Sequence, residues 1–139
     1  MKKFLFVCTG NTCRSPMAEG IFNKLAVEND WQAIAQSAGI FVTESKVSEN
    51  SFEVCVENGI DISGHIPTSI TAELIAEADV ILTMTSSHKA AFGGMEKVYT
   101  VSEFFGGEGD IIDPYGGDKN IYRHTFGQLE ALLGNYHED

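Results

Sequence analysis

The first part of the chain shows two hydrophobic patterns in succession. A short uninterrupted apolar run comes first, and apolar residues at helical spacing follow it. Residues 4–7 are apolar without a break, which is typical of a strand covered on both faces in a parallel sheet. A polar turn over residues 9–14 comes next. Residues 15–25 then carry apolar side chains at helical spacing, and we expect Ser15 to cap this helix and Pro16 to be its first residue.

The same alternation continues along the rest of the chain. Further strands are predicted near residues 32–37, 79–84 and 97–100, and further helices near 48–58, 71–78, 86–91, 102–105 and 121–133. In the helix over 48–58, we expect Phe52, Cys55 and Val56 to point inward. Residues 106–120 are rich in glycine and contain Pro114, which predicts a long loop of the kind that often carries function.

Strands that alternate with helices predict the fold class. They indicate a doubly wound, Rossmann-like α/β sandwich of three layers around a central parallel sheet of about four strands. We expect a single domain over residues 1–139, because this length suffices for one core and is too short for two. In such a sheet, ligands bind beyond the carboxyl ends of the strands.

The charge of the chain restricts its partners. Asp and Glu number 20 against 9 Lys and Arg, which gives a formal net charge of −11. A protein this acidic is a poor non-specific binder of nucleic acid or of an anionic membrane. The arginines are Arg14 and Arg123, so an anion site must be local and must use few side chains together with backbone N–H groups.

Cysteine spacing and hydropathy indicate a compartment. Cys8, Cys13 and Cys55 show no zinc-type spacing, so we expect free thiols and no metal site. No apolar run approaches the length of a membrane span, and the four apolar residues after Lys3 are too few for the apolar region of a signal peptide. These features favour a cytoplasmic protein without a membrane partner.

The segment between the first strand and the first helix carries the most informative motif. It reads C-T-G-N-T-C-R-S from Cys8 to Ser15, and a loop in front of a helix N-terminus favours anion binding. Neither a Walker-type lysine motif nor a G-x-G-x-x-G fingerprint occurs here, so nucleotide binding loses its usual chemistry. What remains is a cysteine and an arginine separated by five residues.

A cysteine at this position is suited to nucleophilic catalysis. The helix dipole and the N–H groups that hold an oxyanion also lower a thiol pKa, so we expect Cys8 to be largely thiolate near neutral pH. Arg14 can clamp two oxygens of a phosphoryl group. Ser15 can hydrogen-bond the thiolate, and Gly10 and Asn11 are residue types that accept a positive φ in a tight loop. The alternative is that Cys8 is only a small buried apolar residue at the end of a strand and that Arg14 is a solvated charge.

With these residues, the whole chain resembles the low-molecular-weight protein-tyrosine phosphatase family, whose C-x5-R-S loop has the same position near the N-terminus. In that family a late Asp-Pro-aromatic motif supplies the general acid, and Asp113, Pro114 and Tyr115 match it. The same carboxylate, once ionised, can activate water to hydrolyse a phosphocysteine. The resemblance implies the strand order 2-1-3-4, no metal and no cofactor. It assigns catalysis to Cys8, Arg14 and Asp113, and phosphate or substrate binding to Thr9, Gly10, Asn11, Thr12, Cys13, Ser15 and Tyr115.

Within the family, the chain is similar to the bacterial protein-arginine phosphatases. Thr12 stands where tyrosine-specific members typically carry an aliphatic residue, residues 113–117 read D-P-Y-G-G, and Ile121-Tyr122 stand at the start of the last helix. A hydroxyl can hydrogen-bond a guanidinium N–H, whereas a branched apolar side chain suits a phenyl ring. The resemblance therefore implies that phosphoarginine on proteins is the substrate and inorganic phosphate a product. Asp113 would then both orient the guanidinium and protonate its nitrogen.

Several roles stay open at this point. Tyr115 stands where we expect phenylalanine in an arginine phosphatase, so a tyrosine phosphatase is the alternative. Thr12 can instead satisfy backbone groups of the loop. Cys13 is either a core residue or, as the resemblance suggests, a redox partner that forms a reversible disulfide with Cys8. Tyr115 and Phe41 are candidate pocket walls, of which Phe41 has the weaker support.

Two other function classes fit parts of the pattern. Thiol-dependent arsenate reductases share this fold and a C-x5-R loop, but they need a further cysteine pair near the third strand, and residues 83–95 contain no cysteine. A non-catalytic module that captures phosphorylated partners is the other class. The joint presence of Cys8, Arg14 and Asp113 gives that class no support.

Overall fold

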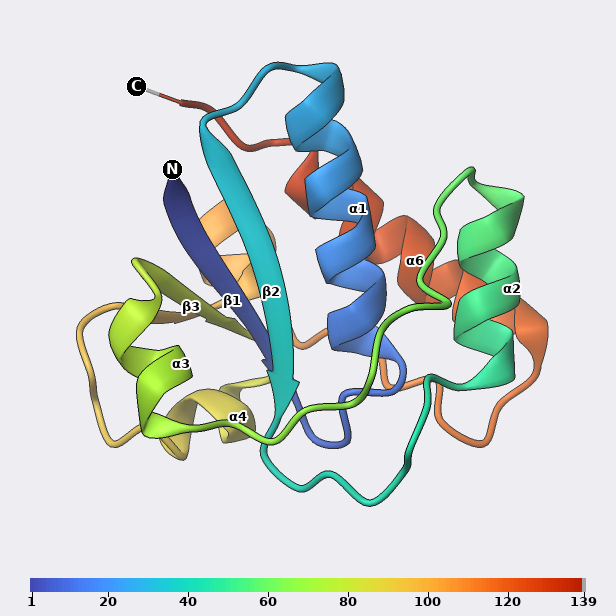
Figure 1. The fold of residues 1–139 in the computed structure, drawn as a ribbon, viewed down its shortest axis with the longest axis horizontal. Helices are drawn as coiled ribbons and strands as arrows, with labels where there is room; N and C mark the ends of the chain where they lie inside the picture. The colour runs from blue at the N-terminus through green and yellow to red at the C-terminus, as the bar shows by residue number, and fades with distance from the viewer. Residues whose placement is uncertain (139) are drawn as a thin grey trace.

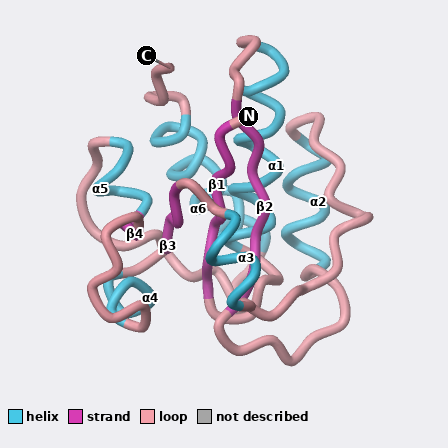
Figure 2. The backbone as a smooth tube through the Cα atoms, turned by 60° about the vertical axis from the view of Figure 1, so that its left-hand side comes forward, coloured by secondary structure: helices cyan, strands magenta, loops and turns pink. Residues whose placement is uncertain are grey.

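Four parallel strands form the central sheet. They are β1 (Lys2–Cys8), β2 (Ala33–Gly39), β3 (Val80–Thr83) and β4 (Val98–Thr100), and they lie in the order β2-β1-β3-β4 (Figures 1 and 2). The structure is a computed structural model that describes residues 1–138. The predicted fold class and strand order are confirmed.

Helices cover both faces of this sheet. On one side lie α1 (Arg14–Glu28), α2 (Glu49–Glu57) and α6 (Lys119–Leu133), and α3 (Ala72–Glu77) lies on the other (Figure 1). Two short helices complete the set of elements: α4 (Ser86–Ala90) follows β3, and α5 (Val101–Phe105) follows β4. The result is the predicted three-layer arrangement.

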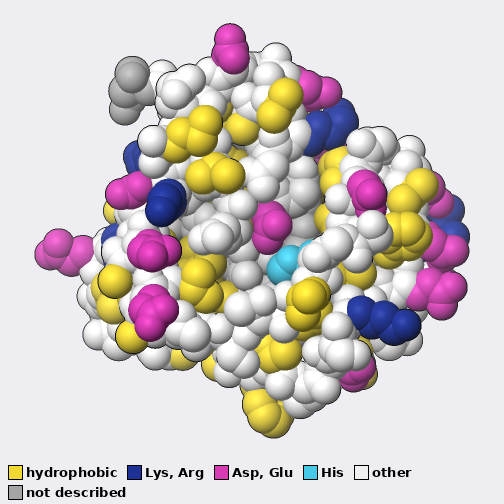
Figure 3. All heavy atoms as spheres, viewed as in Figure 1, with side chains coloured by type: hydrophobic (Ala, Val, Ile, Leu, Met, Phe, Trp, Pro, Cys, Tyr) yellow, Lys and Arg dark blue, Asp and Glu magenta, His cyan; other side chains and the backbone are white. Residues whose placement is uncertain are grey.

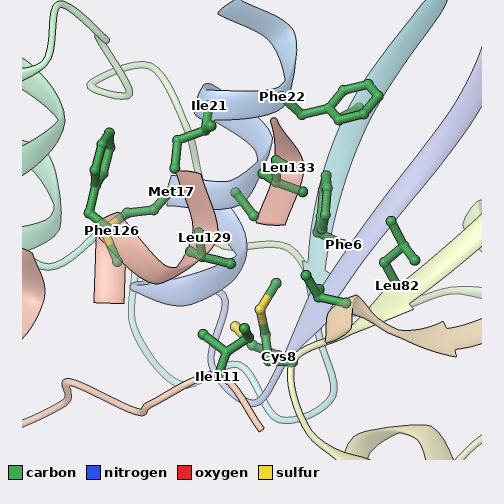
Figure 4. Packing of buried hydrophobic residues seen from close by; sticks show 14 of the residues in the cluster. Phe6, Cys8, Met17, Ile21, Phe22, Leu82, Ile111, Phe126, Leu129 and Leu133 are labelled. Carbon is green, nitrogen blue, oxygen red and sulfur yellow. The ribbon is translucent and has the colours of Figure 1, made fainter. Parts of the chain in front are cut away.

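Strand β1 sends side chains into the cores on both faces of the sheet. Phe4, Phe6 and Cys8 belong to the larger cluster, which packs against α1 and α6, whereas Leu5 and Val7 belong to the smaller cluster, which packs against α3. This alternation follows from the two-residue period of a strand, and burial on both faces explains the uninterrupted apolar run. Figure 4 shows Cys8 at one end of the larger cluster, where β1 stops.

Strand β2 is one of the two edge strands of the sheet, and two of its residues are hydrogen-bonded on the outer side. The side chain of Asn23 takes the place of a neighbouring strand at Ala35: its Nδ2 donates to Ala35 O (3.0 Å) and its Oδ1 accepts from Ala35 N (2.8 Å). At Gly39, the N–H donates to Thr68 O (2.8 Å) and the carbonyl accepts from Ile70 N (2.9 Å). Both residues therefore have partners on their outward side.

Helix α1 begins earlier than predicted. Its first residue is Arg14, and its N-cap is Cys13, which makes no side-chain capping bond. The prediction that Ser15 caps the helix is wrong, because the Ser15 hydroxyl bonds the Cys8 sulfur instead. Pro16 still lies in the first turn, where its missing N–H costs no helical hydrogen bond.

Two other predictions need correction. Val56 on α2 is 52% exposed, although Cys55 beside it is fully buried and Phe52 packs against the core. The buried face of α2 is centred on Val54 and Cys55, and Val56 lies about 100° further around the helix, outside that face. Helix α6 begins at Lys119, earlier than expected, because the Asp118 side chain caps it by accepting a hydrogen bond from Ile121 N.

The outer surface is acidic. Figure 3 shows acidic side chains spread over the visible face, while Lys and Arg side chains stand apart from one another and form no basic patch among the described residues there. Within residues 1–138, no helix combines the length and apolar character needed to cross a membrane.

Candidate active site

The loop over residues 9–13 lies at the carboxyl end of β1, in front of α1. The chain that follows β2 holds it in place, since Phe41 N–H donates to Thr9 O (2.8 Å). Gly39 permits this close approach, because a Cβ at residue 39 would lie 2.7 Å from Thr9 O and 3.0 Å from Asn11 N. We call residues 9–13 the phosphate loop.

Asn11 fixes the centre of the phosphate loop. It is fully buried and has a φ of 56°, as the sequence predicted. Its amide nitrogen donates to Ser15 Oγ (2.8 Å) and to Ser37 Oγ (3.0 Å). Its amide oxygen accepts from Thr68 N–H (2.9 Å) and lies 2.8 Å from His65 Nε2. The two donors and two acceptor positions of the amide are all used.

Gly10 does not use the positive φ that a glycine can adopt. It is not among the residues of the described chain with a positive φ, and a Cβ there would lie 3.7 Å from Thr12 Oγ1, an ordinary contact. Of the two residue types that accept a positive φ, Asn11 adopts one in this loop and Gly10 does not.

The Cys8 thiol lies at the base of the loop and is surrounded by donors. Its sulfur is 2.8 Å from Ser15 Oγ and accepts from Asn11 N–H at 3.3 Å. When Cys8 is a thiolate, the Ser15 O–H is the donor of this pair, because the sulfur then has no proton to give. The predicted hydrogen bond between Ser15 and Cys8 is thus present.

The acidity of Cys8 reflects two opposed effects. Burial raises the pKa of the Cys8 thiol, while the hydrogen bond from Ser15, the positive charge of Arg14 and the Asn11 N–H lower it. The net direction of the pKa is upward, so the expected lowering is wrong. Sequence reasoning counted the helix dipole and the N–H donors, but it could not count how deeply the sulfur is buried in the core.

Arg14 and Asp113 meet across the site. Arg14 is buried, and its Nη1 donates to Ile111 O (3.2 Å) while its Nη2 lies 3.6 Å from Asp113 Oδ2. The Asp113 side chain is 57% exposed, and its Oδ1 accepts from Tyr115 N–H (3.1 Å). The two sequence motifs, far apart along the chain, are therefore joined in one site.

A cavity of about 230 Å³ lies between these groups. Its charged lining residues are Arg14, Glu44 and Asp113, and Phe41 and Tyr115 supply aromatic walls. The full lining is Cys8, Thr9, Gly10, Thr12, Cys13, Arg14, Phe41, Thr43, Glu44, Asp113 and Tyr115. Of the residues predicted for the site, Asn11 and Ser15 are not part of the lining and instead support Cys8 from the buried side.

Thr12 and Cys13 connect the cavity with α6. Thr12 is buried, and its Oγ1 lies 3.5 Å from Cys13 Sγ. Cys13 Sγ is in turn 3.4 Å from the Tyr122 hydroxyl, and burial together with this contact raises the pKa of Tyr122 to about 12. Cys8, Cys13 and Cys55 are all free thiols, and the reversible disulfide between Cys8 and Cys13 stays a prediction.

Sequence reasoning missed two histidines and an acidic residue of this site. His65 Nε2 contacts the Asn11 side chain, His88 Nε2 lies 2.8 Å from Thr9 Oγ1, and Glu44 lines the cavity. One signal was available for His88, since it follows β3 and the carboxyl ends of parallel strands meet at one edge of the sheet. Phe41 does line the cavity, although its support in the sequence was weak.

The described part of the chain offers no cluster of side chains suited to bind a metal ion. No group of three or more His, Cys, Asp or Glu side chains in residues 1–138 is placed to hold a metal ion. The site therefore consists of a thiol, a guanidinium, a carboxylate and the N–H groups of a loop.

A doubly wound sheet whose first strand ends in a thiol, with an arginine and a carboxylate across a small cavity, defines the class of cysteine-based phosphatases. The sequence profile of the "Low molecular weight phosphotyrosine protein phosphatase" family matches residues 3–139. The chain belongs to this family.

The relatives of this chain include proteins named as arginine phosphatases and proteins named as tyrosine phosphatases. A protein-arginine-phosphatase of Bacillus subtilis is 40% identical over 136 residues, which cover 93% of this chain and 90% of the relative. The low molecular weight protein-tyrosine-phosphatase PtpB of Staphylococcus haemolyticus is also 40% identical, over 95% of both chains. A solved structure of the YwlE arginine phosphatase, a mutant with a phosphorylated active site serine, superposes with a TM-score of 0.90 at 38% identity, over 96% of this chain and 91% of that one.

Proposed function

We propose that this chain hydrolyses phosphoarginine on proteins through a phosphocysteine intermediate on Cys8. The observation that carries the proposal is the common cavity of Cys8, Arg14 and Asp113. It places a sulfur nucleophile, a phosphoryl clamp and a proton donor around one small volume. Neither a metal nor a cofactor is needed for these roles.

The first step transfers the phosphoryl group to sulfur. Cys8 reacts in its thiolate form, which the Ser15 hydrogen bond, the Arg14 charge and the Asn11 N–H stabilise against burial. The thiolate attacks phosphorus, the P–N bond breaks, and Asp113 in its acid form gives a proton to the departing guanidino nitrogen. Arg14 and the N–H groups of the phosphate loop hold the charged oxygens during transfer. The phosphorylated active site serine in the YwlE arginine phosphatase mutant supports a covalent phosphoenzyme of this kind.

The second step releases phosphate. Asp113, now a carboxylate, takes a proton from a water molecule, whose oxygen attacks phosphorus as the S–P bond breaks. Inorganic phosphate leaves, the Cys8 thiolate is restored, and Asp113 is again protonated. The exposure of the Asp113 side chain gives water access to this position.

The choice of phosphoarginine follows from the chemistry of the cavity lining. Glu44 and Asp113 add two carboxylates beside Arg14, so a leaving group that carries a cationic guanidinium is better matched than a neutral phenol. The Thr12 hydroxyl lines the same cavity and supplies a polar partner for a guanidinium N–H. The three free cysteines fit a single-domain protein that works in the reducing cytoplasm.

The test compares kcat/KM on phosphoarginine and phosphotyrosine peptides of the same sequence. We expect the wild type to favour phosphoarginine, and Thr12→Ile to lose that preference and gain relative activity on phosphotyrosine. Thr12→Ser, which keeps the hydroxyl, is the matched control and should behave like the wild type. A wild type that favours phosphotyrosine would overturn the substrate assignment.

Phosphotyrosine hydrolysis is the second candidate function. It is favoured by Tyr115 as a wall of the cavity and by the name of the staphylococcal relative, a tyrosine phosphatase with the same identity as the arginine phosphatase. The two candidates share every step at Cys8, Arg14 and Asp113 and differ only in the leaving group.

A further inference from the structure

His88 contacts the phosphate loop from a separate element of the fold. It lies on α4, after β3, and its Nε2 is 2.8 Å from the Thr9 hydroxyl. The residue is only 9% exposed, and its Nδ1 is a buried atom without a hydrogen-bond partner. The single polar contact of the ring is therefore with a residue of the cavity lining.

The unpartnered Nδ1 identifies the tautomer of the ring. A neutral histidine carries its proton on one nitrogen and leaves a lone pair on the other. An unpaired N–H is rarer in protein interiors than an unpaired acceptor, so the proton belongs on Nε2 and the lone pair on Nδ1. His88 then donates to Thr9 Oγ1.

The surroundings keep the ring neutral. Burial and the positive charge of Arg14 lower the pKa of His88, and Asp110 and Asp113 oppose them with smaller effects. A protonated ring would also bury a second N–H at Nδ1, where no acceptor is present. The neutral form with Nε2–H is the state that satisfies both the charges and the hydrogen bonds.

This tautomer controls what the Thr9 hydroxyl can do. Thr9 is an exposed residue that lines the cavity beside Cys8. When Oγ1 accepts from His88, the hydroxyl proton is not used in that contact and remains available to the cavity. We propose that His88 is a positioning residue whose Nε2–H makes the Thr9 hydroxyl a hydrogen-bond donor to a phosphoryl oxygen. The inference rests on the proposed phosphatase function and adds a residue that acts through Thr9.

A double-mutant cycle tests the connection. Thr9→Val should lower kcat/KM roughly tenfold, the size expected for loss of one hydrogen bond to a charged group. His88→Phe, which removes the ring nitrogens, should cause a similar loss, and the double variant should lose no more than Thr9→Val alone. His88→Gln, whose amide can donate from nearly the same position, should recover most of the activity. The inference would be overturned if the losses of kcat/KM from the two single variants multiplied in the double variant, or if His88→Gln were as impaired as His88→Phe.

Two measurements do not depend on turnover. The ¹⁵N chemical shifts of the His88 imidazole in the wild type report the tautomer, and we expect protonation at Nε2; protonation at Nδ1 would overturn the inference even if the variants failed to fold. Titration with inorganic phosphate should show weaker binding by His88→Phe than by the wild type and His88→Gln. Unchanged phosphate affinity in His88→Phe would count against His88 while leaving the proposed function intact.

The proposed function fails differently. A wild type that neither binds inorganic phosphate nor releases it from phosphopeptides would remove the basis for both proposals. A wild type that does both, with an Nδ1–H ring at His88, would remove only the positioning role. The two results are therefore distinguishable in one set of experiments.

Discussion

The buried base of the site, formed by Cys8, Asn11 and Arg14, and the loops around the mouth of the cavity differ sharply in how they are held. Cys8, Asn11 and Arg14 are almost completely buried and have hydrogen bonds to several elements. Phe41 and Tyr115, on loops at the mouth, are 69% and 70% exposed. One part of the site is built into the core, and the other projects into solvent.

The difference separates two tasks. Recognition of a phosphoryl group needs fixed donors, and a buried loop with a satisfied asparagine at its centre provides them. Recognition of the leaving group and of the surrounding peptide falls to exposed side chains, which can change without opening the core. We therefore expect variants of Cys8 and its buried supports to change the rate of chemistry, and variants of the mouth to change the choice of peptide. Thr12 is the exception, because it is buried and yet lines the cavity where the leaving group binds.

The largest effect should come from the buried sulfur. Cys8→Ser should lower kcat at least about 10⁴-fold, as removal of a catalytic nucleophile does, while phosphate and vanadate still bind because the loop N–H groups and Arg14 remain. Cys55→Ala, at a buried thiol that is not part of the cavity lining, is the control and should retain turnover per folded molecule. Steady-state kinetics and anion titration measure the two parts, and substantial turnover by Cys8→Ser would exclude the nucleophile assignment.

The next prediction concerns Asp113, an exposed residue to which we assign the role of general acid. Asp113→Asn should lower kcat about 10²- to 10⁴-fold, because general acid–base catalysis typically contributes that much, with little change in the thermal unfolding temperature since the side chain is exposed. Asp61→Asn changes an exposed carboxylate away from the cavity and should leave kcat unchanged. Equal activity of Asp113→Asn and the wild type would show that the acid lies elsewhere.

A smaller effect should appear as a change in pH dependence. The Ser15 hydrogen bond lowers the pKa of Cys8, so Ser15→Ala should raise that pKa and leave less thiolate at a given pH. The ascending limb of the kcat/KM profile should move to higher pH, with the loss greatest in acid and shrinking as pH rises. Ser15→Thr keeps a hydroxyl and should restore the position of the limb. A loss that is uniform across the profile would contradict this role of Ser15.

The smallest effect belongs to the mouth of the cavity. Glu44→Gln should lower kcat/KM about two- to fivefold on phosphopeptides with basic flanking residues, because exposed charge pairs contribute little, and should leave acidic peptides unaffected or improved. The effect should fade as salt rises. Glu108→Gln, an exposed site outside the cavity lining, is the matched control. Equal losses on basic and acidic peptides would mean that Glu44 does not read substrate charge.

The same division governs what the sequence could predict. The apolar run that ends at Cys8 and the helical spacing that follows it predicted the strand, the loop and the helix, because these patterns record local periodicity and burial. The joint position of Arg14 and Asp113 followed from the resemblance to a family. The strand and helix patterns are local, so they do not depend on how the rest of the chain packs.

Properties that depend on packing escaped prediction. Ser15 was expected to cap α1, but it bonds a sulfur whose position is set by β1. The pKa of Cys8 moves upward because the larger core surrounds the thiol. His88 reaches Thr9 only because β3 and β1 end at the same edge of the sheet. Each outcome depends on the distance between residues that are remote in sequence.

The Asn23 amide on the outer side of β2 has a consequence for behaviour in concentrated solution. Open edge strands invite pairing with other chains and promote aggregation. By bonding both the N–H and the carbonyl of Ala35, Asn23 removes one outward-facing hydrogen-bonding position from that edge, and the partners of Gly39 remove another at the end of the strand. A single asparagine thus helps to keep this edge of the sheet from pairing with the edge strand of another molecule.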